Sequence, residues 1–233
     1  MENVQLGLYY LPYDYFQDPV LMDELIYSNM YKNYYWSDDF SAEYYIAQAK
    51  AGFIAVTDYF EEEELLLPEI QFSYAVLDFQ DLHISRKVKK LLKTKALYLE
   101  INQDIDVVAE KINATHKNCW LSSRYINMIK DTQGLDENFQ LISVVLKDDN
   151  TIVAGELGYV IGKTYTSLSG FSSREKQYNN YGTAQLVLLA QHLEESGFAF
   201  WNLGQPYMSY KLALGAKIHD RKAFLARWFN ATN

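Results

Sequence analysis

The sequence predicts an α/β (α+β) fold in which one mixed sheet is flanked by helices. Apolar runs separated by tight turns predict an antiparallel meander, at 141–146, 151–161 and 164–171. Asp148 to Asn150 and Gly162-Lys163 provide the turns. A helical stretch, 182–196, and a short apolar strand, 198–201, follow the meander. We expect this last strand to join the same sheet.

Length and composition bound the class of protein. A chain of 233 residues with 49% hydrophobic and 22% charged residues is typical of a folded globular protein. We expect a smaller N-terminal α/β subdomain at 1–100 and a main domain at 101–233. The start, MENVQLG, lacks a signal-peptide pattern, and no apolar run is long enough to span a membrane. A soluble cytoplasmic protein is therefore expected.

Neither a metal site nor a disulfide is indicated. The chain has one cysteine, Cys119, and its four histidines are not spaced like metal ligands. The net charge of −9 argues mildly against nonspecific binding to a polyanion, although a local basic face remains compatible with it.

Such a basic face is predicted between residues 85 and 95. Val88, Leu91 and Leu92 fall on one side of a helix, and cations crowd the remainder. These cations are Arg86, Lys87, Lys89, Lys90, Lys93 and Lys95. The patch suits a phosphate backbone, but an amphipathic helix that is merely solvated would have the same pattern.

The stretch from Gly197 to Ala216 has the pattern of a ligand-binding crossing. A buried strand leads into a polar turn with Asn202 and Gln205, and a short helix then ends at Gly215. Polar groups at the carboxyl end of a strand commonly meet ligands in α/β folds. The alternative is structural: Asn202 shapes the turn, Gln205 caps the helix, and Pro206 is its first residue.

Several separated motifs resemble one family in the same order. Gln205 lies ten residues before Gly215, as in the closing motif of the leucyl/phenylalanyl-tRNA–protein transferases. Further segments that resemble the family are LHISR at 82–86, CWLSSRYIN at 119–127 and IVAGELGYVIGKTYTSLSGFS at 152–172. The resemblance spans roughly Asp38 to Trp228. It implies a fold like that of the GCN5-related N-acetyltransferases (GNAT-like).

The resemblance also implies a reaction. The enzyme would be an acyltransferase that moves an amino acid, expected to be hydrophobic, from aminoacyl-tRNA to the N-terminal amine of a protein. The added residue would mark that protein for degradation by the N-degron pathway. Neither a cofactor nor a membrane partner is implied, and a monomer is expected.

Site residues follow from the matched positions. Gln205 would assist the attack of the amine, and Trp120 would stack on the terminal adenosine. Leu168, Ser169, Gly170 and Phe171 would contact the donor. The tRNA backbone would bind to the basic helix, at Arg86, Lys87, Lys89, Lys90 and Lys93. Val56 stands where the family has a second stacking tryptophan.

Departures from the family concern the carboxylates. Leu168 replaces a family Glu that is a candidate to hold the donor's α-amine, and Gly170 replaces a pocket Met. Glu156 is new on the neighbouring strand, where a hairpin turning at Gly162-Lys163 would put it opposite Ser169. We hypothesise that Glu156 holds the α-amine; an outward, solvated Glu is the alternative.

The Asp that orients the Gln in the family is replaced by Leu203. Asn202, one position earlier, could orient Gln205 by hydrogen bonding but cannot supply a negative charge. Two other functions therefore stay open. One is an acyl-CoA-dependent N-acyltransferase that uses a phosphate-binding loop at Asn179 to Ala184, where Gly182 as a close-packed helix start is the structural alternative. The other is an inactive relative that binds tRNA or peptide.

Overall fold

A seven-stranded mixed sheet forms the main body of the molecule. The computed structural model describes residues 4–5, 7–102, 104–117 and 119–232. The strand order is β12-β6-β11-β10-β9-β8-β7, and only the β10–β11 pair is parallel. The strands are β6 (Ser73–Leu77), β7 (Leu97–Ile101), β8 (Phe139–Asp148), β9 (Thr151–Ile161), β10 (Thr164–Ser172), β11 (Phe200–Asn202) and β12 (Lys217–Asp220). The predicted mixed sheet is therefore confirmed.

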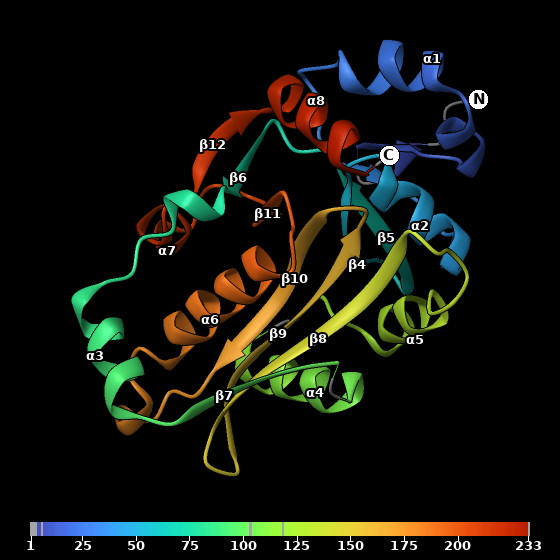
Figure 1. Ribbon diagram of the computed structural model, residues 1–233. Helices are drawn as coiled ribbons and strands as arrows, with labels where there is room; N and C mark the ends of the chain where they lie inside the picture. Colours follow the sequence, from blue (N-terminus) through green and yellow to red (C-terminus); the bar gives the residue numbers. More distant parts are fainter. Residues whose placement is uncertain (1–3, 6, 103, 118, 233) are drawn as a thin grey trace.

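Helices cover both faces of this curled sheet (Figure 1). One face packs on α6 (Tyr181–Glu195), with α3 (Arg86–Thr94) and α7 (Ser209–Leu214) beside it. The other face contacts α4 (Ile105–Thr115), and the core on that side extends to α2 (Ala42–Lys50), α5 (Ser123–Asp131) and α8 (Arg221–Thr232). Each face thus has its own buried apolar cluster.

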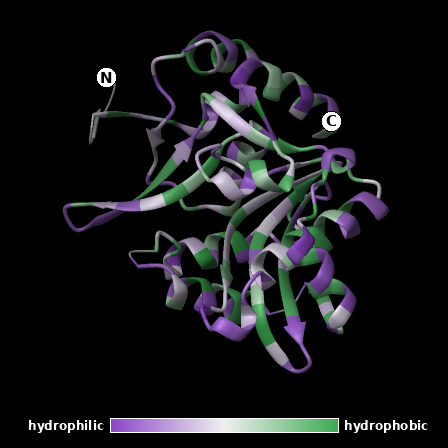
Figure 2. Ribbon diagram, turned by 90° about the vertical axis from the view of Figure 1, so that its left-hand side faces the viewer, coloured by the Kyte–Doolittle hydropathy of each residue, from purple (hydrophilic) through white to green (hydrophobic). Residues whose placement is uncertain are grey.

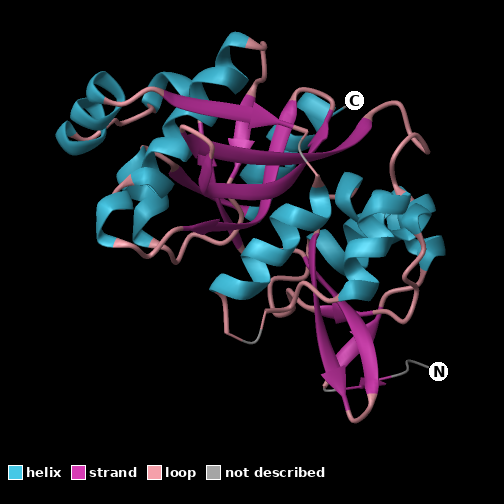
Figure 3. Cartoon of the chain, turned by 90° about the horizontal axis from the view of Figure 1, so that it is seen from below, coloured by secondary structure: helices cyan, strands magenta, loops and turns pink. Residues whose placement is uncertain are grey.

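The first seventy residues build a smaller unit against this body. Its elements are β1 (Val4–Gln5), β2 (Leu8–Tyr10), α1 (Pro19–Leu21), a π-helical turn (Met22–Tyr27), β3 (Tyr35–Trp36), α2, β4 (Ile54–Phe60) and β5 (Glu63–Glu69). Short 3₁₀ turns lie at 13–17, 79–81 and 176–178. The β4–β5 hairpin projects from the molecule with a hydrophilic tip at Glu61 to Glu64 (Figures 2 and 3).

Local signals place most helix boundaries correctly. Ser41, Ser85 and Ser122 each accept a hydrogen bond from a backbone N–H in the first turn of α2, α3 and α5, as an N-cap does. Gly215 ends α7 with φ of 111°, and an added Cβ would lie 2.0 Å from the carbonyl oxygen of Asp81. Only glycine fits both conditions.

Two details differ from the sequence-based prediction. The pairing of Ile161 with Thr164 is confirmed, but a β-bulge between Ser167 and Ser169 shifts the later register, so Glu156 pairs with Gly170 and not with Ser169. Helix α7 begins at Ser209, so Gln205 does not cap it and Pro206 is not its first residue.

Strands on both sides of residue 100 belong to the same sheet. We expected subdomains at 1–100 and 101–233. Strand β6 lies wholly before residue 101, and β7 ends at that residue. Both strands pair within the seven-stranded sheet, together with strands from the second segment. No helix among the described residues has the length and apolar composition to cross a membrane.

Arg221, at the start of α8, ties the smaller unit to the main body. Its side chain is fully buried, and all five of its N–H donors are used on backbone carbonyls. The acceptors are Ile26 (3.1 Å), Asn29 (2.5 Å), Lys32 (2.9 Å), Ile70 (2.7 Å) and Gln71 (3.0 Å). One side chain therefore joins the segment 26–32, the end of β5 and α8.

We expect Arg221→Met to lower the free energy of unfolding by at least about 3 kcal/mol, because it leaves several carbonyls without a donor. For a chain of this size the loss corresponds to about 6–12 °C in Tm. Thermal unfolding followed by circular dichroism measures it, and Lys222→Met, at the exposed next position, is the control. Equal melting temperatures for the two variants would contradict the role of Arg221.

Candidate active site

The turn after β11 presents Gln205. The amide oxygen of Asn202 accepts a hydrogen bond from the Gly204 N–H (2.9 Å), and its Nδ2 lies 3.4 Å from Thr166 Oγ1. Gly204 adopts φ of 72°, which favours glycine. Asn202 is buried, so it shapes the turn. The hydrogen bond expected from Asn202 to Gln205 is not among the contacts of the described residues.

Gln205 is oriented instead by Glu69, at the end of β5. Its Nε2 donates to Glu69 Oε2 (2.7 Å) and to the Tyr34 hydroxyl (3.1 Å). Asn33 Nδ2 donates to the other Glu69 oxygen (2.9 Å). Because a carboxylate only accepts hydrogen bonds, Glu69 fixes which end of the Gln205 amide faces it. The carbonyl end of Gln205 is left for a ligand donor.

Tyr34 completes this cluster, and its hydroxyl group stays protonated. Burial, followed by the charge of Glu69 and a hydrogen bond to it, raises the pKa of Tyr34 well above its usual range. The hydroxyl therefore keeps its proton at physiological pH. Glu69 itself is buried, with 7% of its surface exposed. The result is one negative charge held by three neutral groups behind Gln205.

Lys211, in α7, forms hydrogen bonds to the backbone of the turn that contains Gln205. Its Nζ donates to the carbonyl oxygens of Leu203 (2.5 Å) and Gln205 (2.7 Å). The side chain is buried, and this burial lowers the pKa of Lys211 to about 8. The turn is thus held from both sides, by Asn202 within it and by Lys211 from the following helix.

Glu156, in β9, lies in a separate network on the α6 face of the sheet. Its Oε1 accepts from the Tyr165 hydroxyl (2.9 Å) and Ser167 Oγ (2.7 Å), and its Oε2 accepts from Gln185 Nε2 (3.0 Å). Only 3% of Glu156 is exposed, so an outward, solvated orientation is ruled out. Burial raises the pKa of its carboxyl group, and the three hydrogen bonds oppose that shift.

The predicted donor contacts on β10 lie mainly on the opposite face. Leu168 and Phe171 belong to the core on the α4 side, and Ser169 pairs with Leu157 of that core. Gly170 instead pairs with Glu156, and its carbonyl oxygen is 2.7 Å from His116 Nε2. The structure therefore brings together Glu156 and Gly170 but separates Glu156 from Leu168.

Trp120 also lies on the α4 side. Its ring is partly buried and meets Tyr125 edge-on, with 5.0 Å between the ring centroids. Its carbonyl oxygen accepts from Thr57 Oγ1 (2.5 Å), in β4. Val56, the position of the family's second tryptophan, is the neighbour of Thr57 in the chain. Positions 56 and 120 are therefore close in space, although Val56 faces the opposite side of β4.

The basic helix α3 carries its cations into solvent. Arg86, Lys87, Lys89, Lys90 and Lys93 are all exposed. None of the five is in an ion pair within the described part of the chain, whereas Lys95 pairs with Asp148 at 3.4 Å. His83 Nδ1 contacts the carbonyl oxygen of Ala213 (3.0 Å), which joins the start of α3 to α7. The cations thus remain available to a ligand.

The start of α6 is closely packed. A Cβ on Gly182 would lie 2.9 Å from Ser172 Cβ and 3.2 Å from its Oγ. Asn180 precedes the helix with φ of 72°, and its side chain makes no capping hydrogen bond. Ser172 therefore fills the space beside Gly182, which agrees with the structural reading of this glycine.

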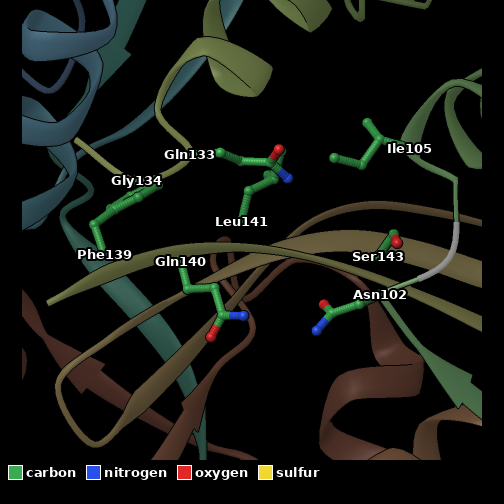
Figure 4. Close-up of a pocket in the computed structure, with 8 residues that line it drawn as sticks. All are labelled: Asn102, Ile105, Gln133, Gly134, Phe139, Gln140, Leu141 and Ser143. Carbon is green, nitrogen blue, oxygen red and sulfur yellow. The ribbon is translucent and has the colours of Figure 1, made fainter. Parts of the chain in front are cut away.

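A pocket of about 340 Å³ opens beside residues 139–143 of β8, the part of that strand that does not pair with β7 (Figure 4). It is lined by Asn102, Ile105, Gln133, Gly134, Phe139, Gln140, Leu141 and Ser143. This lining contains none of the predicted site residues and no charged side chain. No cluster of metal-ligating side chains occurs among the residues that the structure describes.

Glu69, Tyr34 and Lys211 are the site residues that sequence reasoning missed. Glu69 follows the apolar run LLLP at the end of β5, far from the exposed glutamates at the start of that strand. A charge in such a run is rarely buried without a role, and this signal could have singled it out. Tyr34 and Lys211 have no comparable signal, because tyrosines are abundant in this chain and a lysine in a short helix is ordinarily exposed.

Known proteins were compared with this chain by structure and by sequence. Two solved structures are similar to this chain at low sequence identity. FemX is 11% identical with a TM-score of 0.47, over 64% of this chain and 59% of that one. A GCN5-related N-acetyltransferase from Kribbella flavida is 12% identical with a TM-score of 0.38, over 66% and 59%.

Sequence comparison is more specific. A leucyl/phenylalanyl-tRNA–protein transferase of Pseudomonas fluorescens (strain Pf0-1) is 28% identical over 168 residues, which cover 68% of this chain and 69% of that protein. The family model described as leucyl/phenylalanyl-tRNA protein transferase matches residues 76–228, well over half of the chain. The protein therefore belongs to the leucyl/phenylalanyl-tRNA protein transferase family of aminoacyltransferases.

Proposed function

We propose that this aminoacyltransferase moves an amino acid from a charged tRNA to the N-terminal amine of a protein, with Gln205 at the reacting centre. The Gln205–Glu69–Tyr34 cluster carries the proposal, because it holds a polar side chain rigidly at the carboxyl end of β11. The added residue would mark the acceptor for degradation, as the N-degron pathway does. The names of the relatives favour a hydrophobic amino acid.

The chemistry is an aminolysis of an ester. The acceptor nitrogen attacks the ester carbonyl, a C–N bond forms, and the bond from carbonyl carbon to ribose oxygen breaks. One amine proton ends on the ribose oxygen. The carbonyl oxygen of Gln205 accepts a hydrogen bond from the attacking amine and stabilises the positive charge that develops there. Glu69 supports this charge through the Gln205 amide, a role that neutral Asn202 does not perform.

The remaining predicted residues bind the donor. We propose that the exposed cations of α3 contact the tRNA backbone and that Trp120 stacks on the terminal adenosine. Leu168, Ser169, Gly170 and Phe171 stay our proposed contacts for the aminoacyl end. Glu156 stays our proposed contact for the α-amine of the donor. The close packing of Gly182 on Ser172 favours this function over acyl-CoA binding at Asn179 to Ala184.

We expect Gln205→Ala and Glu69→Gln each to lower kcat for transfer about a hundredfold or more, because the first removes the acceptor for the attacking amine and the second removes the charge behind it. Radiolabelled amino acids from a pool of charged tRNAs, offered to model proteins with varied N-terminal residues, provide the measurement. Gln177→Ala and Glu175→Gln are matched controls, since these two residues form an exposed pair of the same kind (2.9 Å). Absence of transfer by the wild type from every tRNA would contradict the proposal.

Binding of uncharged tRNA tests the basic helix. The double variant Lys87→Gln, Lys90→Gln should bind more weakly, and the slope of log K against log salt should flatten by about 1–2, because each phosphate contact contributes about 0.7–0.9. Fluorescence anisotropy at several salt concentrations measures both. Lys163→Gln, Lys222→Gln, which changes two exposed lysines elsewhere, is the control. Equal slopes for the two double variants would exclude α3 as the tRNA surface.

Lys211 predicts a pH dependence of stability. Its pKa is about 8 when folded and 10.5 ordinarily, so between these values the unfolded chain binds more protons. The free energy of unfolding therefore rises with pH in this window. We expect the stability difference between wild type and Lys211→Met to grow by about 2 kcal/mol from pH 7 to pH 9.5. Urea titrations at both pH values measure it, and a difference that stays constant would contradict the lowered pKa.

A further inference from the structure

Three large side chains with apolar surface are exposed in the segment that directly follows Gln205. Tyr207 has 80% of its surface exposed, Met208 has 52% and Tyr210 has 45%. Single exposed apolar residues are ordinary on a protein surface, whereas a group of neighbours commonly marks a binding site. We call Tyr207, Met208 and Tyr210 the Tyr207 patch.

The backbone of this patch is held in place. Pro206 has a restricted φ angle, and Lys211 Nζ donates to the carbonyl oxygen of Gln205 (2.7 Å). The backbone N–H of Lys211 donates to the carbonyl oxygen of Met208 (3.0 Å). One lysine therefore fixes the chain on both sides of Tyr207. Side chains on a fixed backbone lose less conformational freedom when a ligand binds.

Electrostatic effects locate two residues of the patch relative to the candidate site. Burial is the main cause of the raised pKa of Tyr34, Glu69 adds to it, and Tyr207 makes a further contribution. Burial and then the charge of Glu156 raise the pKa of Tyr210 to about 12. Because electrostatic interactions weaken with distance, the patch borders the site between Tyr34 and Glu156.

The patch carries no accessible charge. The only charged side chain from Gln205 to Gly215 is Lys211, which is buried and donates to two carbonyl oxygens. Binding of a tRNA backbone depends on exposed cations, and these lie on α3. His83, before α3, contacts Ala213 near the far end of α7, whereas Tyr207 and Met208 precede the first residue of α7. The patch therefore suits an apolar ligand rather than phosphates.

We propose that the Tyr207 patch binds the acceptor protein, and that the side chain of the acceptor's second residue packs on Tyr207 and Met208. The inference rests on the proposed function. An acceptor whose terminal nitrogen lies at Gln205 has its second Cα about 3.8 Å beyond its first. Tyr207 is two residues from Gln205, a span of at most about 7 Å. The second residue can therefore reach the patch.

The chemistry of the patch indicates which second residues it prefers. Tyrosine offers a flat apolar ring, and methionine adapts to side chains of varied shape. An aromatic or aliphatic side chain would cover both and remove apolar surface from water. A serine would cover little, and a carboxylate would lose hydration without gaining a partner. Acceptors with an apolar second residue are therefore the expected substrates.

The test varies only the second residue of the acceptor. Values of kcat/KM are measured for transfer from tRNA charged with leucine or phenylalanine to model proteins that carry phenylalanine, leucine, serine or aspartate there. We expect the wild type to prefer phenylalanine and leucine by about tenfold or more, a factor that one apolar contact can supply. Fluorescence anisotropy of labelled peptides with the same N-termini measures binding without the reaction and should give the same order.

A double variant tests the two residues directly. Tyr207→Ser, Met208→Ser should remove the preference by slowing only the acceptors with an apolar second residue, and the KM for charged tRNA should stay unchanged. Tyr98→Ser, Leu135→Ser is the matched control, since these side chains are exposed elsewhere, by 56% and 53%. The control should keep the preference. Circular dichroism verifies that both variants are folded.

Three outcomes would contradict the expectation in distinguishable ways. Transfer and peptide binding that ignore the second residue would overturn the inference and leave the proposed function intact. A raised KM for charged tRNA in Tyr207→Ser, Met208→Ser, with the acceptor preference unchanged, would assign the patch to tRNA instead. Absence of transfer to every acceptor would remove the proposed function on which the inference rests.

Discussion

The five hydrogen bonds of Arg221 are the constraint on which the rest of the structure depends. Two of their acceptors, Lys32 and Ile70, are the chain neighbours of Asn33 and Glu69, which hold the carboxylate side of the candidate site. The Ile70 N–H also donates to the carbonyl oxygen of Asn33 (2.8 Å). Folding of the last helix thus sets the position of groups from the first seventy residues, and the site is complete only when both units are docked.

The buried charged side chains of the described chain share one kind of environment. The two buried carboxylates are Glu69 and Glu156, and the two buried cations are Lys211 and Arg221. None of the four forms an ion pair with another; each is held by neutral hydroxyl, amide or carbonyl groups. Such fixed dipoles orient a charge without neutralising it. The neutral donors around Glu69 and Glu156 therefore fix the orientation of both side chains.

Local features of the fold could be predicted from sequence because they depend on neighbouring residues. The serine caps, the hairpin turns and the glycine that ends α7 are examples, and the order of the motifs identified the family. The bulge at Leu168 could not be predicted from the position of the hairpin turn, and it moved the partner of Glu156 by one residue.

The candidate site was predictable only in part, for a related reason. Gln205 was identified by its motif, but its partner was assigned to Asn202 on the basis of proximity in the chain. The partner in the structure is 136 residues away, in β5. Hydrogen bonds across such separations follow from the docking of whole units. The charge that Asn202 cannot supply is present, but on a segment that the motif does not include.

The position of Glu69 also shows which residues the candidate site requires. Glu69 and Tyr34 both precede residue 76, where the match to the family model begins. A fragment cut to the matched region would keep Gln205 and lose the groups that orient it, together with every acceptor of Arg221. The region that the family model matches is therefore smaller than the unit that holds Gln205 in place, because the residues before position 76 supply the hydrogen-bond partners of its amide.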